Sequence, residues 1–330
     1  MQIAVAVVEG TFDSGLCAVL DVFGTANSLI GQREPGPVPF TVTTVGAGSQ
    51  VRTGNGLLLA TEPVAGLTQR PDLLLLPAVG LKSPDQIIEA VRSDANAWVP
   101  ALAGEVHAAG ADLAAACTGA FFLAESGVLD GRRATTSWWA GPAFRARYPE
   151  VRLDDSRTLV HDGAFTTAAA AFAHIDLALA VVHRHSPALA DLVARYLLIG
   201  DRPSQAAFAA PTLLAQADPL VAAFERWART HLADPPPLGA AARTLGVSER
   251  TLQRTTQSVI GMSPLDFLQE IRLDEATFLL RTTTMGPDAI AARVGYRNTS
   301  TLRTLVRRRR GTTLRALRQG GAAPEREQQD

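Results

Sequence analysis

The sequence predicts two domains of different class: a doubly wound α/β domain built on a parallel sheet, then an all-α domain containing two helix-turn-helix units. Three observations predict this division. The chain has 330 residues, long for one domain at roughly 150 residues each. Short apolar runs alternate with helical stretches over the first two hundred residues, whereas only helical periodicity follows. Charge also changes, because residues 1–217 carry 14 basic and 20 acidic side chains and residues 218–320 carry 16 and 9.

Four apolar runs are the expected strands of the α/β domain, at residues 3–8, 40–46, 72–80 and 111–117. The third run is too uniformly apolar to have a solvent-exposed face. Continuous apolar strands between helices are typical of a parallel sheet covered on both faces. The expected crossover helices span residues 14–30, 84–109 and 118–127. A strand pair within residues 157–169 and a closing helix at 171–183 complete a domain of residues 1–199.

Residues 200–217 are the expected linker, because the stretch from 200 to 219 holds three prolines and no sustained period. The helical domain follows at residues 218–319. Its first helix is marked by apolar residues from Phe224 to Leu232, and a long amphipathic helix is marked by those from Phe267 to Leu280. The tail, residues 320–330, is polar, and we expect it to be disordered.

A pattern of three small or apolar residues occurs twice in the helical domain. Its members are Ala242, Gly246 and Leu252 in the first copy, and Ala291, Gly295 and Leu302 in the second. The alanine lets two helices approach, the glycine permits a left-handed backbone, and the leucine packs between the helices. Ser248 also stands where an N-cap belongs. Two copies about fifty residues apart predict a doubled helix-turn-helix.

Residues 218–319 resemble the DNA-binding domain of AraC/XylS-type transcription regulators, especially in the stretches GVSERTLQR, GMSPLDFLQEIRLDEATFLLR and IAARVGY. The resemblance implies recognition helices at about residues 248–258 and 298–309 that enter successive major-groove segments of double-stranded DNA. The residues that it assigns to base reading in the first helix are Arg250, Gln253 and Arg254, and in the second helix we expect Arg303 to read bases. Those expected to hold phosphates are Ser248, Thr251, Ser300, Arg307, Arg308, Arg309 and Arg310.

The second unit departs from the family pattern. Thr304 stands where a base-reading arginine is common. Aromatic core residues of the family are replaced by Leu302, Val306 and Leu317, and in the first unit by Thr256. We therefore expect the first recognition helix to specify the DNA sequence and the second to anchor the protein on phosphates. The alternative for the arginine run is a solvated charged surface.

The amino-terminal domain has its own resemblance, carried by CTGAFFLAESGVLDGRRATTSWW at residues 117–139 and AHIDLAL at residues 173–179. These stretches are similar to the ThiJ/PfpI branch of the class I glutamine amidotransferase-like superfamily, which is fused to AraC-type domains in GlxA-type regulators. The likeness spans roughly residues 1–195. It implies a domain that is built on a flavodoxin-like, amidotransferase-like sheet, and it implies that this domain binds a ligand and dimerises. Cys117 would then follow a strand and precede a helix, at the carboxyl edge of the sheet.

The surroundings of Cys117 depart from those of catalytic relatives. Thr118 follows the cysteine, Ser137 stands where fused regulators often have a histidine, and Gly15 stands at the position of an acid. The loop at residues 77–80, normally glycine-rich so that its amides face an oxyanion, reads Pro-Ala-Val-Gly. Base, acid and oxyanion loop are all affected, so we expect no catalysis at Cys117.

We expect the same region to form a ligand pocket whose occupancy changes how the helical domain presents to DNA. His174 stands where relatives have a glycine, and without a carboxylate to orient it we expect a polar wall rather than a base. The residues expected to line the pocket are Thr11, Phe12, Ala78, Val79, Cys117, Thr118, Ser137, Trp138 and His174. No metal or organic cofactor is expected.

Two other functions stay open at this point. One is a cysteine-dependent hydrolase or glyoxalase-like enzyme that the helical domain merely localises, and the other is a redox sensor in which Cys17 resolves oxidised Cys117. Two cysteines form no disulfide framework and suit a reducing compartment. The first ten residues are typical of a buried strand rather than a signal peptide, and no run of ~18 apolar residues offers a membrane span. We expect a cytoplasmic homodimer that binds double-stranded DNA and an unidentified small molecule.

Overall fold

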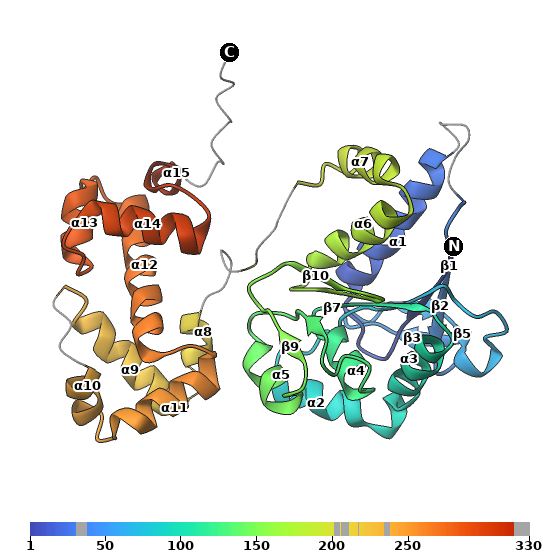
Figure 1. Cartoon of the computed structure of the whole chain (residues 1–330), viewed down its shortest axis with the longest axis horizontal. Helices are drawn as coiled ribbons and strands as arrows, with labels where there is room; N and C mark the ends of the chain where they lie inside the picture. Colours follow the sequence, from blue (N-terminus) through green and yellow to red (C-terminus); the bar gives the residue numbers. More distant parts are fainter. Residues whose placement is uncertain (31–37, 201–204, 206–210, 217, 234–237, 320–330) are drawn as a thin grey trace, which may run out of the picture. The chain divides into compact units, whose positions relative to one another are not determined.

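The computed structural model describes residues 1–30, 38–200, 205, 211–216, 218–233 and 238–319 (Figure 1). The chain divides into two compact units, Met1–Gln205 and Ala206–Asp330. The expected fold class is confirmed, because a mostly parallel α/β unit precedes a helical one. Most of the expected linker at 200–217 and all of the tail at 320–330 lie outside the described residues.

A seven-stranded sheet forms the centre of the first unit, in the order β10-β11-β7-β6-β1-β2-β5. All neighbouring strands are parallel except β10 and β11. The bounds are β1 (Gln2–Ala6), β2 (Thr41–Gly46), β5 (Glu62–Pro63), β6 (Leu73–Leu76), β7 (Asp112–Ala116), β10 (Leu159–Asp162) and β11 (Phe165–Ala168). The four apolar runs of the sequence therefore contain β1, β2, β6 and β7, and the expected strand pair is β10 with β11.

Alternate residues of each strand face two separate apolar cores. Ala4, Leu74 and Leu113 pack with the helices of one face, which are α2 (Pro84–Arg92), α3 (Trp98–Ala108), α4 (Gly119–Glu125) and α5 (Gly141–Arg147). Ile3 and Leu73 pack with those of the other face, which are α1 (Asp13–Ile30), α6 (Ala173–His185) and α7 (Pro187–Tyr196) (Figure 1). Because helices cover both faces, β6 is apolar at every position.

Several short elements depart from the expected ones. The single helix expected at 84–109 is broken into α2 and α3, because Ser93 adopts an extended backbone and a 3-10 turn, Asp94–Asn96, follows. The apolar pattern does not predict α5 or α7. It also misses two small sheets, formed by β3 (Gln50–Arg52) with β4 (Leu58–Ala60) and by β8 (Arg133–Ala134) with β9 (Arg152–Leu153). Strands of two or three residues are too short to show a period.

The helical unit contains two apolar cores that share one long helix, α12 (Pro264–Thr282). Phe267 and Ile271 from its first half pack with α8 (Pro211–Ala215), α9 (Pro219–Thr230), α10 (Leu238–Thr244) and α11 (Glu249–Ile260). Its second half packs with α13 (Pro287–Arg293), α14 (Thr299–Arg310) and α15 (Leu314–Arg318). Helix α8 lies inside the stretch expected as a linker, but Ala215 is buried in the first core, so α8 belongs to the helical unit.

From the N-caps of α11 and α14 onward the two halves are copies related by a shift of 50 residues, which we call the 50-residue repeat, whereas the turns before these helices are related by a shift of 49. Ser248 and Asn298 cap α11 and α14, and each side chain accepts a hydrogen bond from the backbone N–H three residues later, at 3.0 and 2.9 Å. Gly261 and Gly311 end the two helices with a left-handed backbone. Leu252 has its counterpart in Leu302, and both are fully buried. The doubled unit expected from the sequence is therefore present.

Candidate functional site

Helix α11 presents one polar face to solvent. Arg250, Gln253, Arg254 and Gln257 are exposed at the spacing i, i+3, i+4, i+7. Leu252 lies on the opposite, buried side of the helix. The three residues predicted to read bases in the first recognition helix thus share one accessible face, as insertion into a major groove requires.

Helix α14 presents the equivalent face under the 50-residue repeat. Ser300, Arg303, Thr304 and Arg307 are exposed at the same spacing. Arg303, the residue predicted to read bases here, replaces Gln253 of the first copy. One guanidinium and two hydroxyls offer fewer distinct base contacts than the first helix does, while Arg307 adds a charge suited to phosphate.

Each recognition helix follows a tight turn of the same construction. Gly246 and Gly295 adopt φ of 70° and 82°. The backbone N–H after each glycine donates to the carbonyl of Ala242 or Ala291, at 3.0 and 2.8 Å. These alanines are buried where the two helices of each unit meet. The small residue and the glycine of the sequence pattern therefore have the roles that the pattern predicts.

Two of the four arginines that end α14 turn away from solvent. Arg309 donates to Glu270 at 2.9 Å and to Asp266 at 2.8 Å. Arg310 forms ion pairs with Glu270 at 2.7 Å and Asp274 at 2.9 Å. The three carboxylates are spaced four residues apart along one face of α12, and Glu270 is buried. We call these five residues the ion-pair lattice.

The lattice corrects the expected set of phosphate-binding residues. Arg309 and Arg310 have carboxylate partners inside the helical unit, so they are not free for DNA. The physical reason is that α14 lies against α12, whose acidic face compensates both charges. Arg307 and Arg308, one turn earlier, are exposed. Only the first half of the arginine run stays a candidate for phosphate binding.

The three hydroxyls predicted to hold phosphates lie at the N-terminal ends of α11 and α14. The Ser248 hydroxyl caps α11 and lies 2.8 Å from the Thr251 hydroxyl. The Ser300 hydroxyl donates to Asn298 at 2.6 Å. Helix N-termini attract anions because their free N–H groups point outward. Phosphate binding by these three hydroxyls stays a prediction.

In the first unit, Cys117 occupies a strained turn between β7 and α4, with φ of 56°. Its thiol is buried, and its Sγ lies 2.7 Å from the Ser137 Oγ. Burial raises the pKa of this thiol above its ordinary value, although hydrogen bonds from Ser137 and Thr118 oppose the rise. A raised pKa keeps the sulfur protonated and weakens it as a nucleophile.

His174 fills the space beside Gly15. A Cβ added at Gly15 would lie 2.7 to 2.8 Å from three atoms of the imidazole ring. The ring therefore stands where the side chain of an acid at position 15 would begin. His174 Nε2 accepts a hydrogen bond from the Ala78 N–H at 3.0 Å, which assigns the proton to Nδ1 beside the Ala171 carbonyl. Burial lowers the pKa of His174 to about 4, so the ring is neutral.

The amides of the loop before α2 are also occupied by side chains. The Val79 N–H donates to the Thr118 hydroxyl at 2.8 Å, and that hydroxyl donates to the Val79 carbonyl at 3.0 Å. The Ala78 N–H is taken by His174. In an acyl-transfer site these amides would donate to an oxyanion. Here they donate to side chains of the same unit instead.

The structure brings the nine predicted pocket residues together, and we call them the elbow cluster. Their lining of a ligand pocket stays a prediction. Seven of them are buried, whereas Phe12 and Trp138 are half-buried at the border. The polar atoms of Cys117, Thr118 and His174 bond to partners within the unit. A ligand at this place must displace one of these side chains.

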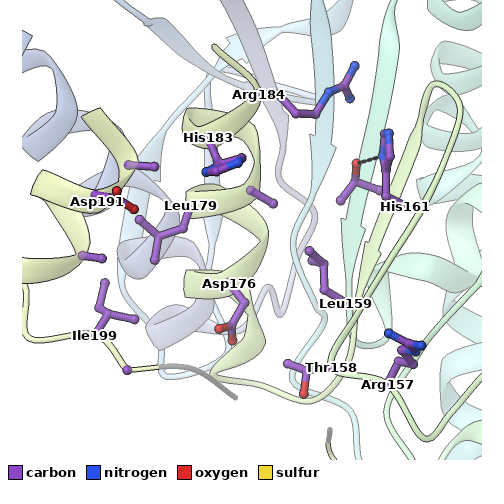
Figure 2. A pocket seen from close by; sticks show the side chains of 15 residues that line it. Arg157, Thr158, Leu159, His161, Asp176, Leu179, His183, Arg184, Asp191 and Ile199 are labelled. Carbon is purple, nitrogen blue, oxygen red and sulfur yellow. Dashed lines mark hydrogen bonds between the residues drawn. The ribbon is translucent and has the colours of Figure 1, made fainter. Parts of the chain in front are cut away.

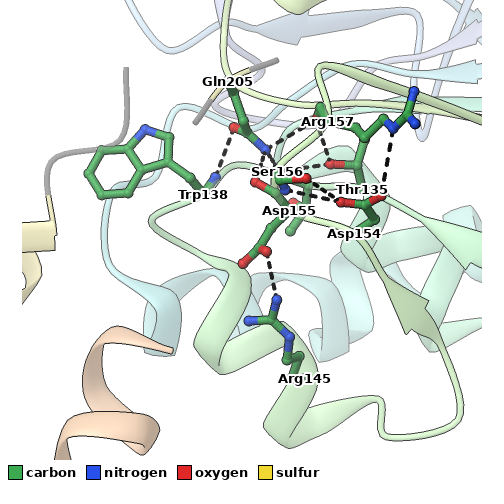
Figure 3. A network of polar contacts seen from close by, with 9 residues as sticks. Thr135, Trp138, Arg145, Asp154, Asp155, Ser156, Arg157 and Gln205 are labelled. Atoms are coloured by element: carbon green, nitrogen blue, oxygen red, sulfur yellow. Dashed lines mark hydrogen bonds and ion pairs between the residues drawn. The ribbon is translucent and has the colours of Figure 1, made fainter. Parts of the chain in front are cut away.

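Gln205 makes contacts that the sequence does not predict. Its side chain is buried, and its amide nitrogen donates to the carbonyls of Thr136 and Asp155, both at 2.8 Å. Its side-chain oxygen accepts from the Trp138 N–H at 3.0 Å (Figure 3). The chain is thus fastened, where it leaves the first unit, to residues 136–138, which we call the strip. No local pattern could reveal contacts across more than forty residues.

An open groove lies between β10, α6 and α7 (Figure 2). Its volume is about 560 Å³. Leu159 and His161 line it from β10, and Leu179 and His183 from α6. The groove also borders Arg184, which pairs with Asp112 at 2.9 Å. We call it the α6/α7 groove.

Neither a metal centre nor a membrane span is found among the described residues. They contain no group of three or more histidine, cysteine, aspartate or glutamate side chains arranged to hold a metal ion. No described helix combines the length and apolar composition that a bilayer crossing requires.

Comparison with known families assigns both units. The model of the DJ-1/PfpI family matches residues 1–184. A model described as a helix-turn-helix domain matches residues 241–320. Both matches agree with the resemblances that the sequence motifs predict.

Two relatives are HTH-type transcriptional regulators. The HTH-type transcriptional regulator CdhR of Pseudomonas aeruginosa is 28% identical over 257 residues, covering 77% of this chain and 74% of CdhR. The HTH-type transcriptional regulator GlxA of Rhizobium meliloti is 29% identical over 184 residues, covering 54% of this chain and 56% of GlxA. A solved protein of Vibrio parahaemolyticus covers 60% of this chain and 98% of its own, with a TM-score of 0.51 and 16% identity, and shares the fold alone.

Proposed function

We propose that this chain, which belongs to the DJ-1/PfpI family, is a sequence-specific DNA-binding transcription regulator. The doubled helix-turn-helix carries the proposal, because α11 and α14 expose matching faces at a shift of 50 residues. The relatives CdhR and GlxA, both HTH-type transcriptional regulators, support it. We propose a cytoplasmic location for this regulator.

The first recognition helix specifies the sequence in this proposal. Arg250 and Arg254 can each grip guanine with two hydrogen bonds, and Gln253 can grip adenine in the same way. Each such contact discriminates by about 1–3 kcal/mol. The second helix contributes Arg303 to a base and Arg307 and Arg308 to phosphates, which add affinity without sequence information.

Selection from a random duplex library tests the proposal. The full chain should enrich a site with two conserved segments about one helical turn apart, the segment under α11 being the more strictly conserved. Recovery of unrelated duplexes after repeated rounds would contradict sequence-specific binding.

We further propose that Cys117 is not a catalyst. Three features of the elbow cluster support this: the raised pKa of the thiol, the imidazole beside Gly15, and the loop amides bound to Thr118 and His174. The same raised pKa disfavours the redox-sensor alternative, since oxidation follows thiolate character and exposure.

Alkylation with iodoacetamide separates the alternatives. Cys17 is exposed, so it should label first, and Cys117 should label only as the protein unfolds. A Cys17→Ser variant isolates the buried thiol. Fast labelling of that variant near pH 7 would restore the enzyme or redox interpretation.

We also propose that the first unit binds a small effector. Two places are candidates: the elbow cluster, where a ligand must displace the ring of Phe12 or the strip at Trp138, and the α6/α7 groove, which is already open. Displacement of the strip would reach Gln205, and through it the point where the chain leaves the unit. A ligand acts only if its affinity differs between the two arrangements of the protein.

A metabolite screen by melting temperature tests effector binding, with DNA affinity as the second readout. Leu179→Trp fills the α6/α7 groove, and Gln205→Ala releases the strip. If Leu179→Trp abolishes the ligand-induced rise in melting temperature, the effector binds in the α6/α7 groove. If Gln205→Ala keeps that rise but abolishes the effect of the ligand on DNA affinity, the signal passes through Gln205. A unit that no metabolite stabilises would be a dimerisation scaffold instead.

Light scattering on the full chain tests the expected homodimer.

A further inference from the structure

A second strongly charged feature lies beside α14, in a cleft of about 810 Å³ between the exposed face of that helix and α15. Five arginines line it: Arg303, Arg307 and Arg308 from α14, and Arg315 and Arg318 from α15. All five are exposed. We call it the five-arginine cleft.

These guanidinium groups lack acidic partners in the described part of the chain, where no carboxylate oxygen lies within 4.0 Å of any of them. The adjacent Arg309 and Arg310 show the contrast, since carboxylates compensate both. Arg308 acts on the Asp266 carboxylate only from a longer distance, so five like charges around one cleft repel each other with little compensation. Such a group is favourable only when an anion occupies the cleft.

The 50-residue repeat shows that the fold does not need these charges. The counterparts of the five arginines in the first copy are Gln253, Gln257, Ser258, Leu265 and Leu268. None of them is charged. Leu265, at the position of Arg315, is 59% exposed, so this position accepts an apolar side chain in solvent. The second copy therefore carries five positive charges at positions that are neutral in the first copy.

The position of α15 is fixed independently of its arginines. Leu314 and Leu317 are buried in the second core, and the Thr313 hydroxyl caps the helix by accepting from the Ala316 N–H at 3.1 Å. Arg315 and Arg318, three residues apart, project from the other side. Arg318 also donates to the Met285 carbonyl, so it is held toward the cleft.

We infer that the five-arginine cleft binds the phosphodiester backbone of the operator, with α15 as a second phosphate-binding element beside the recognition helix. This inference rests on the proposed function. One wall of the cleft is the face of α14 that carries Arg303, so its occupant must lie alongside the major groove that α14 enters. A DNA strand meets that condition and carries a regular row of phosphates, which guanidinium groups bind with two hydrogen bonds each.

The salt dependence of DNA binding tests the inference. The double variant Arg315→Leu with Arg318→Leu introduces the residues that the first copy has at the matching positions, Leu265 and Leu268. Removal of one phosphate contact should reduce the slope of log K against log salt by about 0.9, so this double variant should reduce the slope by about 1.8. It should weaken selected and random duplexes by the same factor, because phosphates carry no sequence information.

Two controls keep the test decisive. Arg226→Leu with Arg281→Leu removes two exposed arginines outside the cleft and should leave the slope close to that of the unmodified protein. Arg315→Gln with Arg318→Gln keeps polar side chains, and it should reproduce the reduced slope even where the double leucine variant melts at a lower temperature. A steep slope in the unmodified protein that neither cleft variant reduces would overturn the inference and leave the proposed function intact. Absence of DNA binding by the unmodified protein would overturn both.

Discussion

At the scale of single residues, two exchanges distinguish this chain. Beside Gly15, where the family resemblance predicts an acid, lies the neutral imidazole of His174, which bonds to the Ala78 N–H. Arg310 stands where the 50-residue repeat has Ile260, and it is tolerated because Glu270 and Asp274 surround its guanidinium. In both places the neighbouring residues supply partners for the polar side chain: the Ala78 N–H for His174, and two carboxylates for Arg310.

The pH dependence of stability tests the state of His174. Its pKa is about 4 in the folded protein, against about 6.5 in an unfolded chain. Between these values the unfolded chain binds a proton that the folded one does not. The contribution of His174 is therefore complete above about pH 6.5, and it is lost as the pH falls toward 4. When the pH falls from 7 to 5, the proton uptake of His174 in the unfolded chain should lower the free energy of unfolding by about 2 kcal/mol.

Urea unfolding at the two pH values, followed by tryptophan fluorescence, measures this cost. His174→Gln keeps an acceptor for the Ala78 N–H and should lose about 2 kcal/mol less than the unmodified protein on acidification. His183→Gln, an exposed histidine on the same helix, is the matched control. Equal losses in the unmodified protein and His174→Gln would show that the buried ring is not the cause.

At the scale of elements, the two turns of the helix-turn-helix units differ in what surrounds them. Both glycines have positive φ. A Cβ at Gly246 would meet nothing within 4 Å, whereas one at Gly295 would collide with the Leu232 carbonyl and the Arg272 guanidinium. The second turn therefore packs on the end of α9, and the first lies free of such contact.

Alanine at each glycine should reveal this difference. Gly246→Ala should cost about 1–2 kcal/mol, the strain of a left-handed backbone alone. Gly295→Ala adds a steric collision, so we expect a larger loss, which hydrogen exchange of the α14 amides would measure locally. Equal losses at the two turns would contradict the packing of Gly295 against α9.

The ion-pair lattice offers a second test at this scale. Glu270→Gln leaves two guanidinium groups short of a buried partner and should destabilise α14 by about 3–5 kcal/mol. Arg310→Ile restores the residue type of the first copy and keeps Arg309 paired, so it should cost less. Hydrogen exchange along α14 gives both values. A larger loss for Arg310→Ile would assign the stabilisation to Arg310 packing instead of to Glu270.

Long elements could be predicted from the sequence, and contacts between distant residues could not. The uniformly apolar run of β6 and the alanine–glycine pattern before α11 each carry a strong local signal. The partners of Arg309 lie about forty positions away on α12, so no local period reveals that Arg309 points inward. Arg315 could have been found by extending the repeat past Gly311, because its counterpart Leu265 is neutral.

The same limit explains the elbow cluster. Its residues could be assigned to one edge of the sheet from their positions after strands, and they do converge there. Whether they leave a pocket depends on side-chain volumes and hydrogen bonds among segments far apart in the sequence. His174 closes the space beside Gly15 from 159 positions away.

At the scale of the whole molecule, we propose that the two copies of the repeat have different tasks. The first presents Arg250, Gln253 and Arg254 on a recognition helix next to a neutral surface. The second presents the five-arginine cleft. Specific contacts and phosphate contacts contribute differently, since only the second kind weakens steeply with salt. The division predicts that specificity and affinity can be altered separately.

Separate alteration can be tested with one variant from each copy. Gln253→Ala should reduce discrimination between selected and random duplexes, by about 1–3 kcal/mol, and leave the salt slope unchanged. Arg307→Ala should weaken both duplexes equally and lower the slope by about 0.9. Identical effects of the two substitutions on both duplexes would refute the division.

The proposed function depends above all on the helical unit reading a specific DNA sequence. Fluorescence anisotropy tests it most directly, with the full chain on a duplex recovered by selection, random duplex as competitor, and salt raised from about 50 to 200 mM. We predict that the selected duplex stays bound against at least a roughly 10³-fold excess of competitor, and that affinity falls with salt while this preference persists. Equal affinity for both duplexes, abolished by modest salt, would contradict the claim.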